Sequence, residues 1–145
     1  MDAILSYLQG QIRAAAAVQS PLVIRGGGTK DFYGQSVAGA VLDMTPYAGI
    51  VDYDPTELVI TARAGTPLAD LEQTLRASGQ MLPCEPPHFG MHATLGGAVA
   101  AGLSGPRRPY AGAMRDIVLG VRLFDGRRGG RRLRRPATKN AGRLH

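Results

Sequence analysis

The sequence predicts an α+β fold, in which short strands follow one another along the chain with few helices between them. Apolar residues at helical spacing open the chain at residues 4–17. Apolar runs of strand length follow at 22–24, 40–44, 49–53, 57–64 and 116–124. Because few of the intervening stretches are long enough for a crossover helix, this order favours α+β over a doubly wound parallel sheet.

Local signals define the elements of the first half. The opening helix is expected to end near Gln19-Ser20-Pro21, and the first strand then leads into the glycines at 26–28. Asp54-Pro55-Thr56 separates the third and fourth strands and has the residues that a turn favours. We therefore expect these two strands to pair.

A helix is predicted after Gly65. Thr66 is placed to cap its first amides, and Pro67 occupies the first helical position, where its missing N–H costs nothing. Gly79 is placed to end the helix in a left-handed conformation. The expected apolar face consists of Leu68, Leu71 and Leu75.

The remaining elements are shorter. Met81-Leu82 is predicted as a brief strand, residues 83–87 as a proline-rich loop, and residues 94–102 as a short helix whose small residues suit close packing. The strand at 116–124 ends at Asp125-Gly126, a dipeptide typical of hairpin turns.

The charge of the chain is concentrated at its C-terminal end. Of the 17 basic residues, eight lie in residues 127–145, which contain no Asp or Glu, so residues 1–126 hold nine basic and 11 acidic residues and have a net charge of −2. A nucleic-acid binder would be expected to carry a basic face on its folded part. The net charge of +6 and the pI of about 10.1 therefore describe the tail.

Composition predicts one globular domain of a cytoplasmic protein. The chain is 44% hydrophobic, has no apolar run long enough to span a membrane, and begins without the basic leader of a secretory signal. The single cysteine, Cys84, cannot form an internal disulfide and is expected to be a small filler residue.

Residues 127–145 differ from everything before them. They lack apolar periodicity, and they supply no convincing partner for the strand that ends at Asp125. We expect a domain over residues 1–126 and a basic tail over 127–145. The tail is interpreted as the product of a reading-frame change or truncation near Gly126, with a natural disordered tail as the alternative.

Two glycine-rich segments are candidate phosphate sites. Residues 25–30 place three glycines directly after a strand, where consecutive backbone N–H groups can turn toward one anion. Residues 94–102 contain no side chain larger than Leu, so a ligand can approach the backbone closely. A flexible turn and a close-packed helix junction are the respective alternatives.

Together these segments resemble the vanillyl-alcohol oxidase family, whose flavin domain is the PCMH-type FAD-binding domain. The strings that carry the resemblance lie at 52–63, 79–88 and 102–109, within a match that covers about residues 20–126. The resemblance implies FAD as cofactor. The FAD contacts that it implies are Gly26, Gly27, Gly28, Thr29, Lys30, Pro87, Thr94, Gly96, Gly97 and Gly102.

Within the family, the chain is most similar to the FAD-binding subunits of bacterial glycolate oxidases. This implies oxidation of glycolate or another 2-hydroxy acid to the 2-oxo acid. It also implies a second flavoprotein subunit and an iron–sulfur subunit as partners, through which the protein would lie peripherally at the inner membrane. Thr29-Lys30 replaces the histidine that many members bond to flavin, so FAD is expected to be non-covalent. The family's flavin domain continues beyond the last strand predicted here, so this chain is expected to be its incomplete N-terminal portion.

Other ionisable residues give weaker signals. No metal site is predicted, because His88 and His92 lie in a proline-rich context and no third ligand is placed by the sequence. Arg107, Arg108 and Arg115 are candidates for binding phosphate or a carboxylate substrate, with a solvated surface as the alternative. No catalytic base is assigned.

Three alternative functions stay open. In the first, the chain is a truncated flavin domain with weak or no FAD binding. In the second, it is a nucleic-acid-binding protein that acts through its arginine-rich tail. The third is the flavin reductase of cell-wall precursor synthesis, whose first loop is similar. The strings at 54–57 and 105–108 count against this reductase.

Overall fold

The computed structural model describes residues 2–32, 35–83, 90–102, 113–127 and 129–134. It confirms the mixed α and β character that the sequence predicts. The described residues form three two-stranded sheets: β1 (Leu22–Arg25) pairs with β2 (Ala40–Asp43), β3 (Ile50–Asp54) with β4 (Val59–Ala62), and β5 (Gly120–Asp125) with β6 (Gly129–Arg134). The β1–β2 pair is parallel and the other two are antiparallel.

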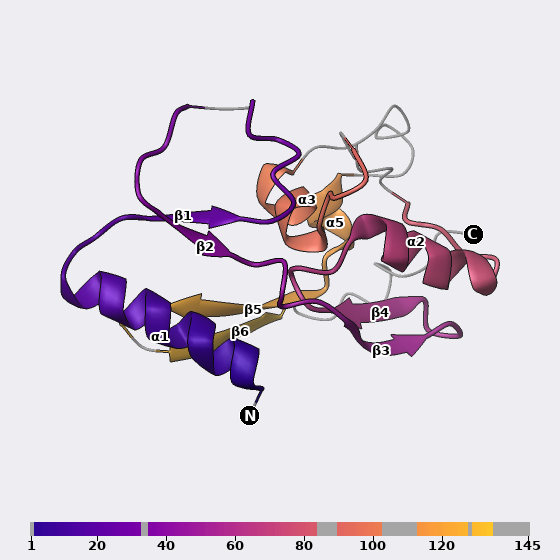
Figure 1. Cartoon of the computed structure of the whole chain (residues 1–145). Coiled ribbons are helices and arrows are strands. Elements are labelled where there is room, and N and C mark those ends of the chain that lie inside the picture. Colours follow the sequence, from indigo (N-terminus) through magenta and orange to yellow (C-terminus); the bar gives the residue numbers. More distant parts are fainter. Residues whose placement is uncertain (1, 33–34, 84–89, 103–112, 128, 135–145) are drawn as a thin grey trace.

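Helix α1 (Ala3–Ala17) opens the chain, as its apolar spacing predicts. The Asp2 carboxylate caps it by accepting a hydrogen bond from the Ile4 amide at 3.0 Å. The helix lies across the β5–β6 hairpin (Figure 1), where a side chain at Gly126 would meet Ala16 and Ile12. The first helix and the last strands of the described chain therefore pack together.

A buried apolar cluster lies around helix α2 (Leu68–Ala77). Leu68, Leu71 and Leu75 are buried on one face of this helix, and Gly79 follows it with a φ of +67°, as expected from the sequence. Two short helices, α3 (Leu95–Ala101) and α5 (Met114–Ile117), complete the cluster through Ala98 and Met114.

Thr66 does not cap α2, contrary to the prediction. Pro67 is the N-cap, and the Thr66 side chain is buried, where its hydroxyl donates to Arg63 O at 2.7 Å and accepts from Gly49 N at 3.0 Å. The hydroxyl forms these hydrogen bonds because a buried polar group without a partner would destabilise the fold. Thr66 thus joins the start of β3 to the chain that follows β4.

Two strand predictions were also wrong. Met81 and Leu82 form no strand; Leu82 instead packs against the α2 cluster. Residues 116–117 belong to α5 because the Asp116 carboxylate accepts a hydrogen bond from Ala113 N at 3.1 Å and so caps a helical turn. The strand itself begins at Gly120.

The expectation that no partner strand follows Gly126 is corrected by β6. It pairs with β5 over six residues, from Asp125 opposite Gly129 to Gly120 opposite Arg134. Backbone pairing in a hairpin depends on the turn and on main-chain groups, so an arginine-rich segment without apolar periodicity can still provide the second strand. Residues 129–134 are therefore not disordered, and the rest of the predicted tail, residues 135–145, lies outside the described residues. The interpretation of residues 127–145 as the product of a reading-frame change or truncation near Gly126 stays a prediction.

Candidate functional site

The parallel pairing of β1 and β2 brings the ends of both strands to one edge. Arg25 lies opposite Asp43 at the last register position, and Met44 N donates to Arg25 O at 2.8 Å just beyond it. Open parallel sheets bind ligands at the carboxyl ends of their strands. Residues 26–30 and 43–45 both lie at this edge.

The loop after β1 is closed by an ion pair. The Arg25 guanidinium contacts the Asp31 carboxylate at 2.7 Å, and Asp31 N donates to Gly28 O at 3.3 Å. The hydrogen bond from Arg25 lowers the pKa of Asp31, and Asp31 in turn raises the pKa of Arg25. Gly28 has a φ of +71°, which only glycine adopts at little cost. The chain therefore returns on itself within one short loop.

The start of this loop packs directly against the segment that precedes α3. A Cβ at Gly26 would meet the Thr94 hydroxyl, and one at Gly27 would meet the backbone carbonyl of His92. Thr94 is 4% exposed and lies behind Gly26. The structure thus brings together the two glycine-rich segments that the sequence singles out.

The amides of the two segments are used differently. The N–H groups of residues 26–29 donate no hydrogen bond to any residue in the described part of the chain. Gly96 N donates to Ala64 O at 2.8 Å, and Gly97 N donates to the Thr94 hydroxyl at 3.2 Å. Only the first loop therefore offers consecutive amides to an anion.

Gly96 serves a packing role as well. Its Cβ would lie 3.0 Å from both the Cβ and the carbonyl oxygen of Ala64, so the absence of a side chain lets α3 approach the end of β4. Gly102 ends α3 with a φ of +64° and does not line the cavity described below. Pro87 lies outside the described residues.

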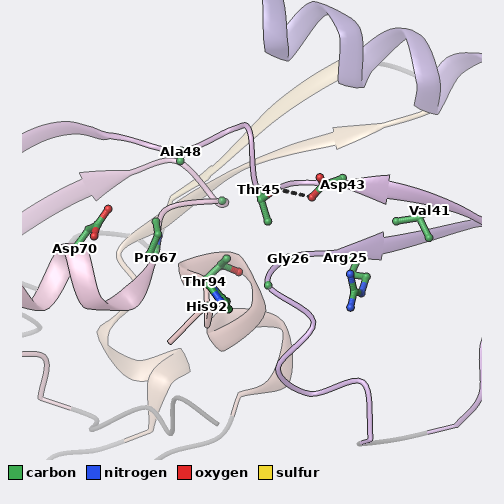
Figure 2. Close-up of a pocket in the computed structure, with 12 residues that line it drawn as sticks. Arg25, Gly26, Val41, Asp43, Thr45, Ala48, Pro67, Asp70, His92 and Thr94 are labelled. Atoms are coloured by element: carbon green, nitrogen blue, oxygen red, sulfur yellow. Dashed lines mark hydrogen bonds between the residues drawn. The ribbon is translucent and has the colours of Figure 1, made fainter. Parts of the chain in front are cut away.

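A cavity of about 580 Å³ extends from the first loop across the β1–β2 edge to the start of α2 (Figure 2). Most of the residues that line this cavity were not predicted from the sequence, because they come from several separate elements. A parallel β1–β2 pairing, had it been predicted, would have indicated Asp43. The lining residues are Arg25, Gly26, Gly27, Val41, Asp43, Thr45, Ala48, Gly65, Pro67, Asp70, His92 and Thr94.

Asp43 is the carboxylate at the strand edge of this cavity. Its Oδ1 accepts hydrogen bonds from Thr45 N at 3.0 Å and from Thr45 Oγ1 at 2.8 Å (Figure 2). These hydrogen bonds lower the pKa of Asp43. The carboxylate is therefore ionised at neutral pH and can only accept hydrogen bonds.

His92 lines this cavity, and the remaining candidates lie away from it or outside the described residues. Arg115 is 82% exposed and contacts Asp116 at 3.9 Å, while Cys84, His88, Arg107 and Arg108 lie outside the described residues. The described residues contain no group of three or more His, Cys, Asp or Glu that could hold a metal ion. None of the described helices has the length and hydrophobicity needed to cross a membrane.

Comparison with solved structures identifies proteins that share this fold. Alkyldihydroxyacetonephosphate synthase, in two crystal forms, matches with a TM-score of 0.71 in both. The sequence identities are 21% and 22%, and the matches cover 93% and 89% of this chain and 26% of the synthase. This likeness shows a shared fold.

Comparison of sequences shows the family. The chain is 57% identical over 116 residues to the glycolate oxidase subunit GlcE of Escherichia coli (strain K12), which covers 80% of this chain and 33% of the relative. The chain thus spans about a third of the length of that relative. The profile of the FAD binding domain family matches residues 7–133. This protein therefore belongs to the FAD-binding domain family, whose cofactor is FAD.

Proposed function

We propose that this chain provides part of the FAD-binding surface of a glycolate oxidase-like subunit, which oxidises glycolate or another 2-hydroxy acid to the 2-oxo acid. The observation that carries the proposal is the loop at residues 26–29, whose consecutive amides have no acceptor in the described chain. The 57% identity to a glycolate oxidase subunit supports the choice of substrate class.

Three features of the first loop support its assignment as the pyrophosphate site. A Cβ at Gly26 or Gly27 would press on the segment at 92–94, so glycines are needed for these amides to stay in place. Gly28 adds a positive φ, a backbone conformation in which successive N–H groups can turn toward one anion. The Thr29 hydroxyl offers a further donor, and the Lys30 ammonium adds positive charge beside the phosphates.

The second glycine-rich segment is proposed to act mainly as support. Thr94 holds the first turn of α3 behind Gly26, while Gly96 and Gly97 let that turn pack closely. Pro87 and Gly102 are proposed to lie toward the flavin end of the cofactor, as the family resemblance implies.

The chemistry supplied by bound FAD is acceptance of a hydride from the substrate. This chain's part is to bind and orient the cofactor without a covalent link, because Thr29-Lys30 stands in the loop. Electrons are proposed to pass onward through a second flavoprotein subunit and an iron–sulfur subunit.

Titration of the purified chain with FAD tests the proposal. We expect saturable binding with a change in flavin fluorescence, and glycolate-dependent bleaching of the flavin when the partner subunits are co-expressed. No FAD binding by the chain would favour a truncated domain without function. FAD binding without a response to any 2-hydroxy acid would refute the proposed reaction alone.

The β5–β6 hairpin favours a second candidate function, binding of nucleic acid. Arg122 lies directly opposite Arg132, and both side chains are exposed. Two adjacent guanidinium groups can contact phosphates of a polyanion. Salt-dependent DNA binding that is lost in the Arg122→Gln/Arg132→Gln variant would support this function, whereas an unchanged affinity would exclude the hairpin as the binding site.

A further inference from the structure

At the edge of the β1–β2 sheet, the glycine loop proposed to bind phosphates lies beside a carboxylate that Thr45 holds in place. Asp43 pairs in register with Arg25, the residue that directly precedes the glycine loop, and both line the same cavity. Val41, on the same face two residues earlier, is 60% exposed and also lines it. The cavity wall next to the loop therefore has an apolar part and an acceptor.

Only half of the Asp43 carboxylate is used within the described chain. Both hydrogen bonds from Thr45 go to Oδ1, which fixes the side chain, and Oδ2 has no partner among the described residues. The bond to Thr45 survives if the carboxylate becomes an amide, because the amide oxygen can take the place of Oδ1. The side chain is held in position independently of a ligand.

Arg25 offsets part of the negative charge of Asp43, but its guanidinium is already paired with Asp31. A carboxylate beside a phosphate loop is therefore favourable when a donor on the ligand contacts it. A dinucleotide carries such donors on both sides of its pyrophosphate, as the hydroxyls of the ribose and of the ribityl chain. An ionised carboxylate forms hydrogen bonds with hydroxyls that are stronger than those between neutral groups. Carboxylates contact ribose hydroxyls in this way in other dinucleotide-binding folds.

We propose that Asp43 accepts a hydrogen bond from a sugar hydroxyl of the bound dinucleotide and so selects for ligands that carry one next to the phosphates. The inference rests on the proposed function, since it requires phosphates in the loop at 26–29. Thr45 is the positioning residue that holds the carboxylate. Asp43 would thus provide selectivity through Oδ2, while its Oδ1 makes the local hydrogen bonds with Thr45.

Calorimetric titration of the purified chain with four probes tests the proposal: ADP, 2′,3′-dideoxy-ADP, FMN and inorganic pyrophosphate. Wild-type protein should bind ADP about tenfold more tightly than dideoxy-ADP. In Asp43→Asn this preference should fall to about twofold, because the amide forms a weaker bond. Loss of the negative charge should not weaken pyrophosphate binding. The ratio of the ADP and dideoxy-ADP affinities therefore measures the contribution of the hydroxyl contact alone.

A matched control is Asp52→Asn, which makes the same change on an exposed carboxylate of β3 outside the cavity. It should leave every ratio unchanged. In Asp43→Asn, a loss of affinity confined to ADP identifies the ribose as the source of the hydroxyl. A loss of affinity confined to FMN, together with equal wild-type affinities for ADP and dideoxy-ADP, identifies the ribityl chain.

The same titrations separate the inference from the proposed function. Equal changes for ADP, FMN and pyrophosphate in Asp43→Asn would overturn the hydroxyl contact while leaving FAD binding intact. Wild-type protein that binds neither FAD nor any probe would overturn the proposed function, and this inference with it.

Discussion

Substitution of Gly27 by Ala tests the close approach on which the site depends. The new Cβ would lie 2.5 Å from the carbonyl carbon of His92 and 2.8 Å from its Cβ, in addition to its contact with the carbonyl oxygen. Carbon atoms pack best at about 3.5–4.0 Å, so relief of the carbon contacts alone requires the two segments to separate by roughly 1 Å, and the carbonyl oxygen requires more. The obstacle is mainly backbone, which cannot rotate away as a side-chain end can.

The expected cost follows from this overlap. Overpacking of this kind destabilises by about 1–3 kcal/mol, which urea denaturation measures as a lower midpoint with an unchanged slope. A displacement of roughly 1 Å also moves the loop amides from about 2.9 Å to beyond 3.5 Å from a phosphate oxygen, where hydrogen bonds weaken steeply. Loss of one such bond should weaken FAD binding by about tenfold or more.

Gly10→Ala is the matched control. Gly10 lies inside α1, has nothing within 4 Å of its would-be Cβ, and is replaced by a better helix former. It should stabilise the protein by up to about 1 kcal/mol and leave FAD affinity unchanged. Equal stability and FAD affinity in Gly27→Ala and wild-type protein would refute the reasoning, since the loop would then not rest on His92.

Three further substitutions probe the surroundings of the site. Thr94→Val removes the hydroxyl that caps α3 and should lower the free energy of unfolding by about 1–2 kcal/mol in urea; no change would show that the cap is dispensable. The hydrogen bond from Arg25 lowers the pKa of Asp31, so its stabilisation is present above the ordinary pKa of about 4 and lost as the pH falls through the lower folded value. Asp31→Asn should therefore flatten the decline of stability below pH about 4, and an identical acid limb would contradict this. Tyr53→Phe removes the hydrogen bond of 2.5 Å to Gln80 and should cost about 1 kcal/mol by thermal denaturation, whereas an unchanged midpoint would show that water replaces it.

Local patterns were sufficient wherever an element depends on its own residues. The spacing of Leu68, Leu71 and Leu75 predicted the buried face of α2, and Gly79 predicted where that helix ends. The turn at residues 54–56 predicted the β3–β4 pair. These features depend on helical periodicity and turn preferences, which act over a few residues.

Predictions failed where a distant group competes for the same atoms. Thr66 has the side chain of a good helix cap, but Gly49 N and Arg63 O take its hydroxyl instead. Arginine-rich residues 129–134 gave no strand signal because their pairing with β5 is formed by main-chain groups. Neither outcome depends on neighbours in the sequence alone.

The sequence by itself determined that two glycine-rich segments exist, and it indicated which family uses them. Only the tertiary structure decided how they differ: Gly26 and Gly27 lie against residues 92–94 with their amides available, whereas the Gly96 and Gly97 amides are consumed by Ala64 and Thr94. The same holds for Asp43, which becomes part of the site because β1 and β2 run parallel and end at one edge. A backbone N–H can bind a ligand only when no acceptor within the protein already forms a hydrogen bond with it. Which acceptors lie close enough to do so depends on the tertiary structure.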